Sequence, residues 1–121
     1  MDNGNGAQFG NSALYKRLIY PYTNWENSET GKGIQLAGVI WYQGEADANS
    51  SKITMPAYTK AMESMVSDYR TVFNDDSLPF MYVQLAAFDN PGGEYAAMRE
   101  AQFNYMIGKN TTNGKPENVG M

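Results

Sequence analysis

Residues 36–41 have the sequence Leu-Ala-Gly-Val-Ile-Trp, a nearly continuous apolar run with polar, turn-forming residues on both sides. A run this short and this apolar predicts a strand buried on both faces, as strands are in parallel sheets. A second run of the same kind, Phe-Met-Tyr-Val-Gln-Leu-Ala, occupies residues 80–86 after Pro79. We therefore expect two neighbouring strands of one parallel sheet.

The residues between the two runs carry the pattern of a long amphipathic helix, from about Pro56 to Phe73. Pro56 is acceptable there because the first turn of a helix does not use its N–H. The apolar side chains form a single stripe at helical spacing: Tyr58, Met62, Met65, Val66, Tyr69, Val72 and Phe73. Strand, helix and strand make a βαβ unit with a right-handed crossover, so the predicted fold class is α/β.

Two further helices are predicted, one on each side of this unit. Residues 12–20 carry apolar side chains at helical spacing, with Ser12 as a plausible N-cap and Pro21 as the stop signal. Residues 94–107 carry a second stripe that includes Gln102. Loops are expected over residues 23–33, 43–52, 74–77 and 108–121.

Length and charge bound the class of protein. The 121 residues suffice for one domain, and the net charge of −4 with no basic block argues against nucleic-acid binding. No run approaches the roughly 18 apolar residues of a membrane helix. Residues 1–11 are polar and Gly-rich, so we expect a flexible lead-in and no secretory signal there. The compartment stays open.

The sequence contains no cysteine and no histidine. The first absence excludes disulfides, thiolate zinc sites and a Cys nucleophile. The second removes the usual general base of serine hydrolases and the commonest metal ligand. We therefore expect neither a metal ion nor a cofactor.

Polar residues follow the first apolar run at the point where ligands bind parallel sheets. Residues 42–47 have the sequence Tyr-Gln-Gly-Glu-Ala-Asp, beyond the carboxyl end of the predicted strand. These residue types suit a binding or catalytic loop. They also suit an ordinary polar turn in which Gly44 supplies a positive φ, and composition alone does not separate the two interpretations.

Several stretches resemble, in the same order, blocks of the sialate O-acetylesterases and related carbohydrate acetylesterases, which are SGNH hydrolases. Residues 38–47 are similar to the block GVIWYQGE[SA][ND], and residues 79–86 to PFYxVQLA. Residues 13–21 resemble ALYNxMIxP, residues 98–102 resemble LREAQ, and residues 117–121 resemble PNTGM. The resemblance covers residues 12–121, which we interpret as the central part of one SGNH-type esterase domain.

The resemblance implies a three-layer α/β/α, flavodoxin-like sandwich that hydrolyses O-acetyl esters on carbohydrates with a Ser–His–Asp site. An acetylated carbohydrate is then the implied substrate. The amide of Gln43 would help backbone N–H groups to hold the oxyanion, and Gly44 would let the turn approach closely. Glu45 would hold the loop, and we expect Arg99 to pair with it and so fix the turn that aims Gln43.

Two departures from the family pattern concern the nucleophile and the base. The nearest match to a GDS turn is residues 75–78, which precede a strand where the nucleophile should follow one, so we expect an ordinary turn. A DxxH segment cannot exist without histidine. The chain therefore resembles the middle of the domain, carries an oxyanion donor without nucleophile or base, and should be inactive alone. Its exposed sheet edges should favour self-association.

Other interpretations remain at this point. Glu45 and Asp47 resemble a glycosidase acid pair only loosely, because neighbours two apart on a loop seldom face the same way. Asp75 and Asp76 lack the alternate spacing of a calcium loop. A non-catalytic carbohydrate-binding or structural remnant of the fold is the alternative to the esterase, with sugar contacts from the aromatic residues Trp25, Trp41 and Tyr42.

Overall fold

The computed structural model describes residues 13–26, 35–48, 54–87 and 94–121. Contacts divide the chain into two units, residues 1–37 and residues 38–121, which we describe separately. In the first unit, helix α1 covers Ala13–Glu26 and contains Pro21. The prediction that Pro21 ends this helix is wrong. A proline fixes φ at a helical value, and it costs one backbone hydrogen bond and a local kink rather than the whole helix. Ser12 lies outside the described residues.

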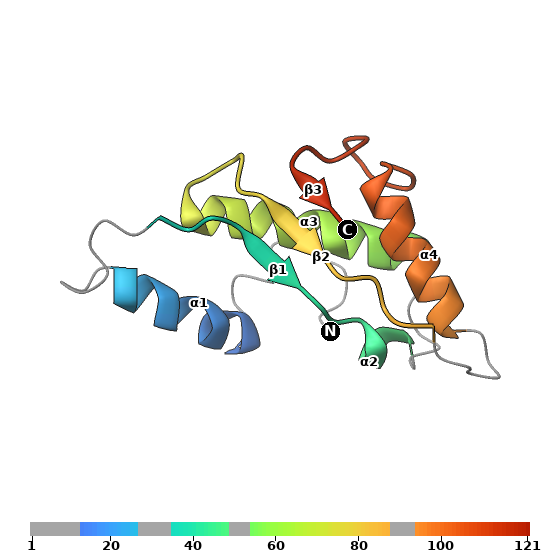
Figure 1. Cartoon of the computed structure of the whole chain (residues 1–121), viewed down its shortest axis with the longest axis horizontal. Helices are drawn as coiled ribbons and strands as arrows, with labels where there is room; N and C mark the ends of the chain where they lie inside the picture. Colours follow the sequence, from blue (N-terminus) through green and yellow to red (C-terminus); the bar gives the residue numbers. More distant parts are fainter. Residues whose placement is uncertain (1–12, 27–34, 49–53, 88–93) are drawn as a thin grey trace. The chain divides into compact units, whose positions relative to one another are not determined.

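The second unit contains a parallel three-stranded sheet in the order β1-β2-β3, which Figure 1 shows as three arrows pointing the same way. The strands are β1 (Val39–Trp41), β2 (Phe80–Tyr82) and β3 (Val119–Gly120). Val39 pairs with Phe80, and Phe80 pairs with Val119. The predicted parallel neighbours and the α/β class are confirmed. The strands are shorter than the apolar runs, and the expected loop at the end of the chain contains β3.

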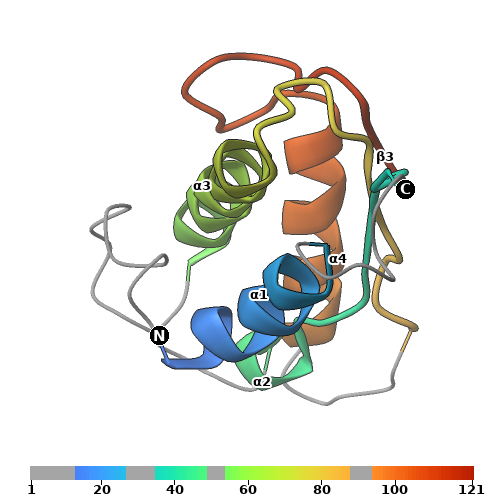
Figure 2. The ribbon, with the colours of Figure 1, turned by 90° about the vertical axis from the view of Figure 1, so that its left-hand side faces the viewer.

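Two long helices pack against each other and lie on the same side of the strands (Figure 2). Helix α3 covers Met55–Phe73, with Thr54 as its N-cap and Asn74 as its C-cap. Helix α4 covers Glu94–Met106. Both agree with the predicted helices to within a residue. A further four-residue helix, α2 (Glu45–Ala48), lies in the stretch expected to be a loop.

The core of this unit lies between the sheet and the two helices. The rings of Tyr69 on α3 and Phe80 on β2 meet edge to face with centroids 5.9 Å apart, and Tyr82 meets Tyr105 of α4 at 6.2 Å. The core is completed by further buried apolar side chains from both helices and from the ends of β2: Tyr58, Met62, Met65, Val66, Leu78, Leu85, Met98 and Ala101.

The expectation that both strands are buried on both faces is wrong for the described structure. Along β2 the side chains alternate, with Phe80 and Tyr82 buried and Met81 55% exposed. On β1, Ile40 is 76% exposed. A continuous apolar run does not reveal which faces are covered. Helices α3 and α4 cover one face, and apolar side chains stand exposed on the other.

Candidate functional site

The segments that follow β1 and β2 meet at the carboxyl edge of the sheet. The N–H of Val83, just beyond β2, donates to the carbonyl of Trp41 at the end of β1 at 2.8 Å. Beyond Trp41, the chain passes through Gln43 and Gly44 into α2. Because both strands run in the same direction, the polar residues after each are brought to one place, as the sequence predicts.

The turn after β1 is built around Gly44, which has a φ of +143°. A Cβ atom at this position would lie 3.1 Å from the hydroxyl of Tyr58, 3.2 Å from Cδ1 of Leu85 and 3.4 Å from Nε2 of Gln102. Only glycine therefore fits both the backbone conformation and the space. The carbonyl of Gly44 accepts from the N–H of Ala48 at 2.8 Å, which starts α2 directly after the turn.

A buried carboxamide, that of Gln102 on α4, joins the turn to the segment after β2. Its Nε2 donates to the backbone carbonyl of Gln43 at 3.3 Å and to the hydroxyl of Tyr58 at 3.4 Å. Its Oε1 accepts from the N–H of Leu85 at 3.1 Å. The Tyr58 hydroxyl also donates to the Gln43 carbonyl at 3.5 Å. The backbone of Gln43 is thus held from α3 and from α4.

The side chain of Gln43 differs from its backbone. It is half-buried, and its amide has no hydrogen bond to any residue that the structure describes. The preceding side chain, Tyr42, is 58% exposed. A fixed backbone that carries an amide not engaged by the described chain is what a donor to a ligand requires.

Two acids and a tyrosine surround the turn. Asp47 on α2 is 6% exposed, and its Oδ2 is buried without a hydrogen-bond partner among the described residues. Burial raises the pKa of the Asp47 carboxyl above its ordinary value. Burial also raises the pKa of Tyr58. The hydrogen bond from Gln102 opposes this rise in the pKa, and the charges of Asp47 and Glu45 add to it. The turn beside Gln43 thus carries two acids, of which Asp47 is buried.

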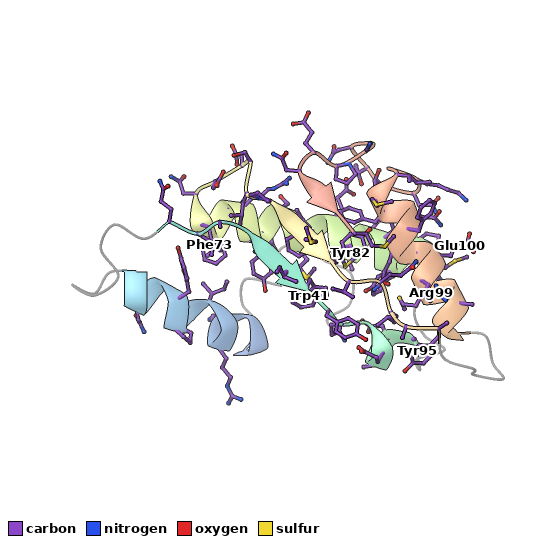
Figure 3. All side chains as sticks on the ribbon, viewed as in Figure 1. Trp41, Phe73, Tyr82, Tyr95, Arg99 and Glu100 are labelled. Atoms are coloured by element: carbon purple, nitrogen blue, oxygen red, sulfur yellow. The ribbon has the colours of Figure 1, made fainter. Side chains whose placement is uncertain are left out.

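Arg99 does not form the expected ion pair. In the described structure no ion pair joins its guanidinium to Glu45, and its Nε is buried without a hydrogen-bond partner there. Glu45 is the first residue of α2, so the helix backbone orders this turn instead. The contribution of Arg99 comes from its backbone. The Arg99 carbonyl accepts from Nε2 of Gln84 at 3.0 Å, and this hydrogen bond links α4 to the segment after β2. Figure 3 labels Arg99 on α4.

The stretch Asp75–Leu78 is an ordinary turn at the opposite edge of the sheet, as predicted. The hydroxyl and the N–H of Ser77 both donate to Oδ1 of Asp75, at 2.7 and 2.9 Å. Ser77 precedes β2, whereas Gln43 follows β1, so this serine is at the wrong end to act with that amide.

The described residues contain no cluster of three or more potential metal ligands, such as Asp, Glu, His or Cys. None of their helices has the length and apolarity that crossing a bilayer demands.

The central roles of Gln102 and Tyr58 do not follow from the sequence. Both lie on the stripes predicted for their helices, a position typical of packing residues. The available signal was Gln102 itself, because an amide on an otherwise apolar stripe must find buried partners. Which partners it finds depends on the tertiary fold.

Comparison with known proteins identifies the family of the chain. Residues 5–114 match the profile of the family described as carbohydrate esterase, sialic acid-specific acetylesterase. A mouse (Mus musculus) sialate O-acetylesterase is 30% identical over 84 residues, which are 64% of this chain and only 13% of that protein. No solved structure matches significantly. Because the family profile covers most of the chain, the chain belongs to the sialic acid-specific acetylesterase family of carbohydrate esterases.

Proposed function

We propose that this chain provides the oxyanion-binding part of a carbohydrate O-acetylesterase, with Gln43 as the side-chain donor. The observation that carries the proposal is the Gln43 turn. Its backbone is fixed by Gln102 and Tyr58, while its amide is not engaged by the described residues. The substrate class is an acetylated carbohydrate, as the family implies.

The chemistry assigned to Gln43 is stabilisation of charge. When a nucleophile attacks an acetyl ester, the carbonyl oxygen becomes an oxyanion, and a prepositioned N–H lowers the energy of that state. Gly44 permits the close approach of the chain.

We propose that the nucleophile and the general base come from other sequence. The 121 residues contain no histidine, and Ser77 lies at the opposite edge of the sheet. The chain also matches only 13% of the length of its mouse relative. We therefore place it within a longer esterase, referred to below as the parent protein, and propose that the chain alone does not turn over substrate.

The direct test is Gln43→Ala in the parent protein, assayed on acetylated sialic acid and on acetylated xylan. We expect kcat to fall about 10²–10³-fold with little change in KM, because the lost donor acts mainly where charge develops. Gln84→Ala is the matched control. It removes an amide at the same edge that donates to the Arg99 carbonyl, and it should leave kcat within a few-fold of wild type. An unchanged kcat in Gln43→Ala refutes the role of Gln43.

Self-association is a separate part of the proposal. The face of the sheet opposite α3 and α4 exposes Ile40 and Met81, and β1 has no strand on its outer side among the described residues. Apolar faces and unpaired edges recruit partners. Sedimentation of the isolated chain should show concentration-dependent association that Ile40→Lys weakens. A monodisperse monomer at all concentrations would contradict this part alone.

A non-catalytic carbohydrate-binding role is the second candidate, favoured by the exposed ring of Tyr42. It predicts that the isolated chain binds a sugar and that Tyr42→Ala abolishes this binding. It also predicts that the intact gene encodes neither a GDS block upstream of this segment nor a DxxH block downstream of it.

A further inference from the structure

We propose that Gln102 is the positioning residue that aims Gln43, by fixing the backbone of the turn from which the Gln43 amide projects. The inference rests on the proposed role of Gln43 and adds a residue on α4, 59 positions away in the sequence, to the working site.

The Gln102 side chain is polar but fully buried. Gln102 is 0% exposed and lies on the apolar stripe of α4, between Met98 and Tyr105. Burying an amide is unfavourable unless each of its polar atoms is hydrogen-bonded. A residue chosen only to fill this space would be apolar, because Leu or Met packs as well without that requirement. The amide is therefore explained by its partners.

The partners of the Gln102 amide also fix its orientation. The Leu85 N–H can only donate, and the Gln43 carbonyl can only accept. The Gln102 amide therefore has one orientation, with Oε1 toward Leu85 and Nε2 toward Gln43, since a flipped amide would set donor against donor and acceptor against acceptor. This side chain thus bridges the segments that follow β1 and β2 through one donor and one acceptor.

Gln102 is hydrogen-bonded to the end of β2 through its backbone and to the segment after β2 through its side chain. The backbone carbonyl of Gln102 accepts from the hydroxyl of Tyr82 at the end of β2. The side chain accepts from Leu85, three residues further on. The amide is thus anchored to the sheet before it reaches Gln43. A rigid anchor matters because a displacement of about 1 Å at a reacting centre can cost about 10²-fold in rate.

Two substitutions of Gln102 keep the shape of its side chain and change its hydrogen bonds. Gln102→Glu puts an oxygen in place of Nε2, so a carboxylate faces the Gln43 carbonyl and repels it. Gln102→Met keeps the volume and removes both donor and acceptor. Thr59→Val is the control, because Thr59 is equally buried and has no hydrogen bond to Gln43. Its hydroxyl lies 3.0 Å from the carbonyl of Met55 and 3.4 Å from that of Ala101.

The test measures kcat and KM of the parent protein. We expect Gln102→Glu to lower kcat about 10²-fold while KM changes less than about three-fold, because the misaimed amide matters mainly in the transition state. Thr59→Val should lower thermal stability without a comparable loss of kcat. If both variants lower kcat in proportion to their loss of stability, Gln102 is a packing residue and the proposal is overturned.

A double-mutant cycle separates this inference from the proposed function. If Gln102 acts through Gln43, adding Gln102→Glu to Gln43→Ala should cause no further loss of kcat. Additive losses would overturn the positioning role and leave the function of Gln43 intact. A Gln43→Ala variant with wild-type kcat would instead refute the proposed function, and the positioning role with it.

The isolated chain offers a readout that needs no activity. In ¹⁵N-labelled protein, Gln102→Met should shift the resonances of the Gly44 N–H and the Gln43 side-chain amide. It should also raise the hydrogen-exchange rate of the Leu85 N–H at least ten-fold. Thr59→Val should leave these signals near their wild-type positions. Unchanged Gln43 and Gly44 resonances in Gln102→Met would overturn the proposal.

Discussion

At each end of the sheet a helix side chain bridges two backbone segments, and these two side chains differ in chemistry. At the amino ends, Arg70 of α3 donates to the carbonyl of Leu78 with Nε and Nη2, at 3.2 and 3.1 Å, and to that of Glu117 at 2.7 Å. At the carboxyl ends, Gln102 of α4 both donates and accepts. A guanidinium can only donate, so it gathers carbonyls, whereas an amide also fixes which way each backbone segment faces.

Burial explains why the ends differ. Arg70 is half-buried and keeps part of its hydration, while Gln102 is fully buried, where a permanent charge would cost far more. The amino ends can therefore be fastened by a strong charged donor that serves stability. At the carboxyl ends a neutral, fully buried amide fixes the geometry of the Gln43 turn. The comparison predicts that damage at one end lowers stability and damage at the other lowers activity.

The largest effect expected from a single methyl group is at Gly44. Gly44→Ala forces a side chain into a backbone with φ of +143° and places Cβ within 3.1 to 3.4 Å of three atoms of the site. We expect a loss of about 1–3 kcal/mol in the free energy of unfolding, together with a fall in the kcat of the parent protein. Denaturant unfolding and steady-state kinetics measure the two effects. A stable variant with normal kcat would show that the turn is not constrained as described.

At the other end, Arg70→Met should lower stability and leave activity alone. It removes the hydrogen bonds to Leu78 and Glu117, and the expected loss is about 2 kcal/mol because the donor is charged. The kcat of the parent protein should change less than about three-fold at temperatures where the variant is folded. Arg17→Met, on an exposed residue of α1, is the control for loss of a surface charge. A fall in kcat as large as that of Gln102→Glu would abolish the contrast between the ends.

The smallest effect expected is at Glu63, which lies away from both ends. Its carboxylate accepts from the N–H groups of Thr112 and Asn113 and from the Asn113 side chain. Burial favours the neutral form of Glu63, but these bonds outweigh it and lower the pKa below the ordinary value of 4.5. Above that pH both the folded and the unfolded state are ionised, and the stabilisation is complete.

As the pH falls below 4.5, the unfolded chain takes up the proton first, so this contribution is lost as the pH passes through the folded pKa. Glu63→Gln should therefore lower stability by less than about 1 kcal/mol at neutral pH, because its hydrogen bonds are exposed to solvent. The difference from wild type should shrink in acid. Thermal unfolding from pH 7 to pH 3 measures it, and a difference that grows as the pH falls would reverse the assignment.

The fold was predictable where local pattern carries the information. Helices α3 and α4 have clear stripes, and the apolar runs of β1 and β2 with a helix between them predict parallel pairing. The covering of each face was not predictable, since Ile40 and Met81 are as apolar as their buried neighbours. The continuation of α1 through Pro21 was not predicted, although a helix can tolerate a proline. Helix α2 was not predicted because four helical residues carry too little pattern.

The sequence predicted where the candidate site lies but not all of the residues that form it. The carboxyl end of a predicted strand located Gln43 and Gly44, and the family resemblance gave Gln43 a role. The predicted Arg99–Glu45 pair was wrong because sequence gives the end of the sheet at which a side chain lies but not its direction. The contact that holds the turn, from Gln102, joins positions 59 residues apart and follows only from the packing of α4 on the sheet.

We propose that this chain contributes an oxyanion donor to a site whose nucleophile and base lie in the rest of the parent protein. The most direct measurement compares turnover of an acetyl ester by the purified 121-residue chain and by the parent protein under the same conditions. We predict a rate equal to the blank for the chain and steady turnover for the parent protein. Steady turnover by the chain alone, abolished by replacing one of its serines, would contradict the account.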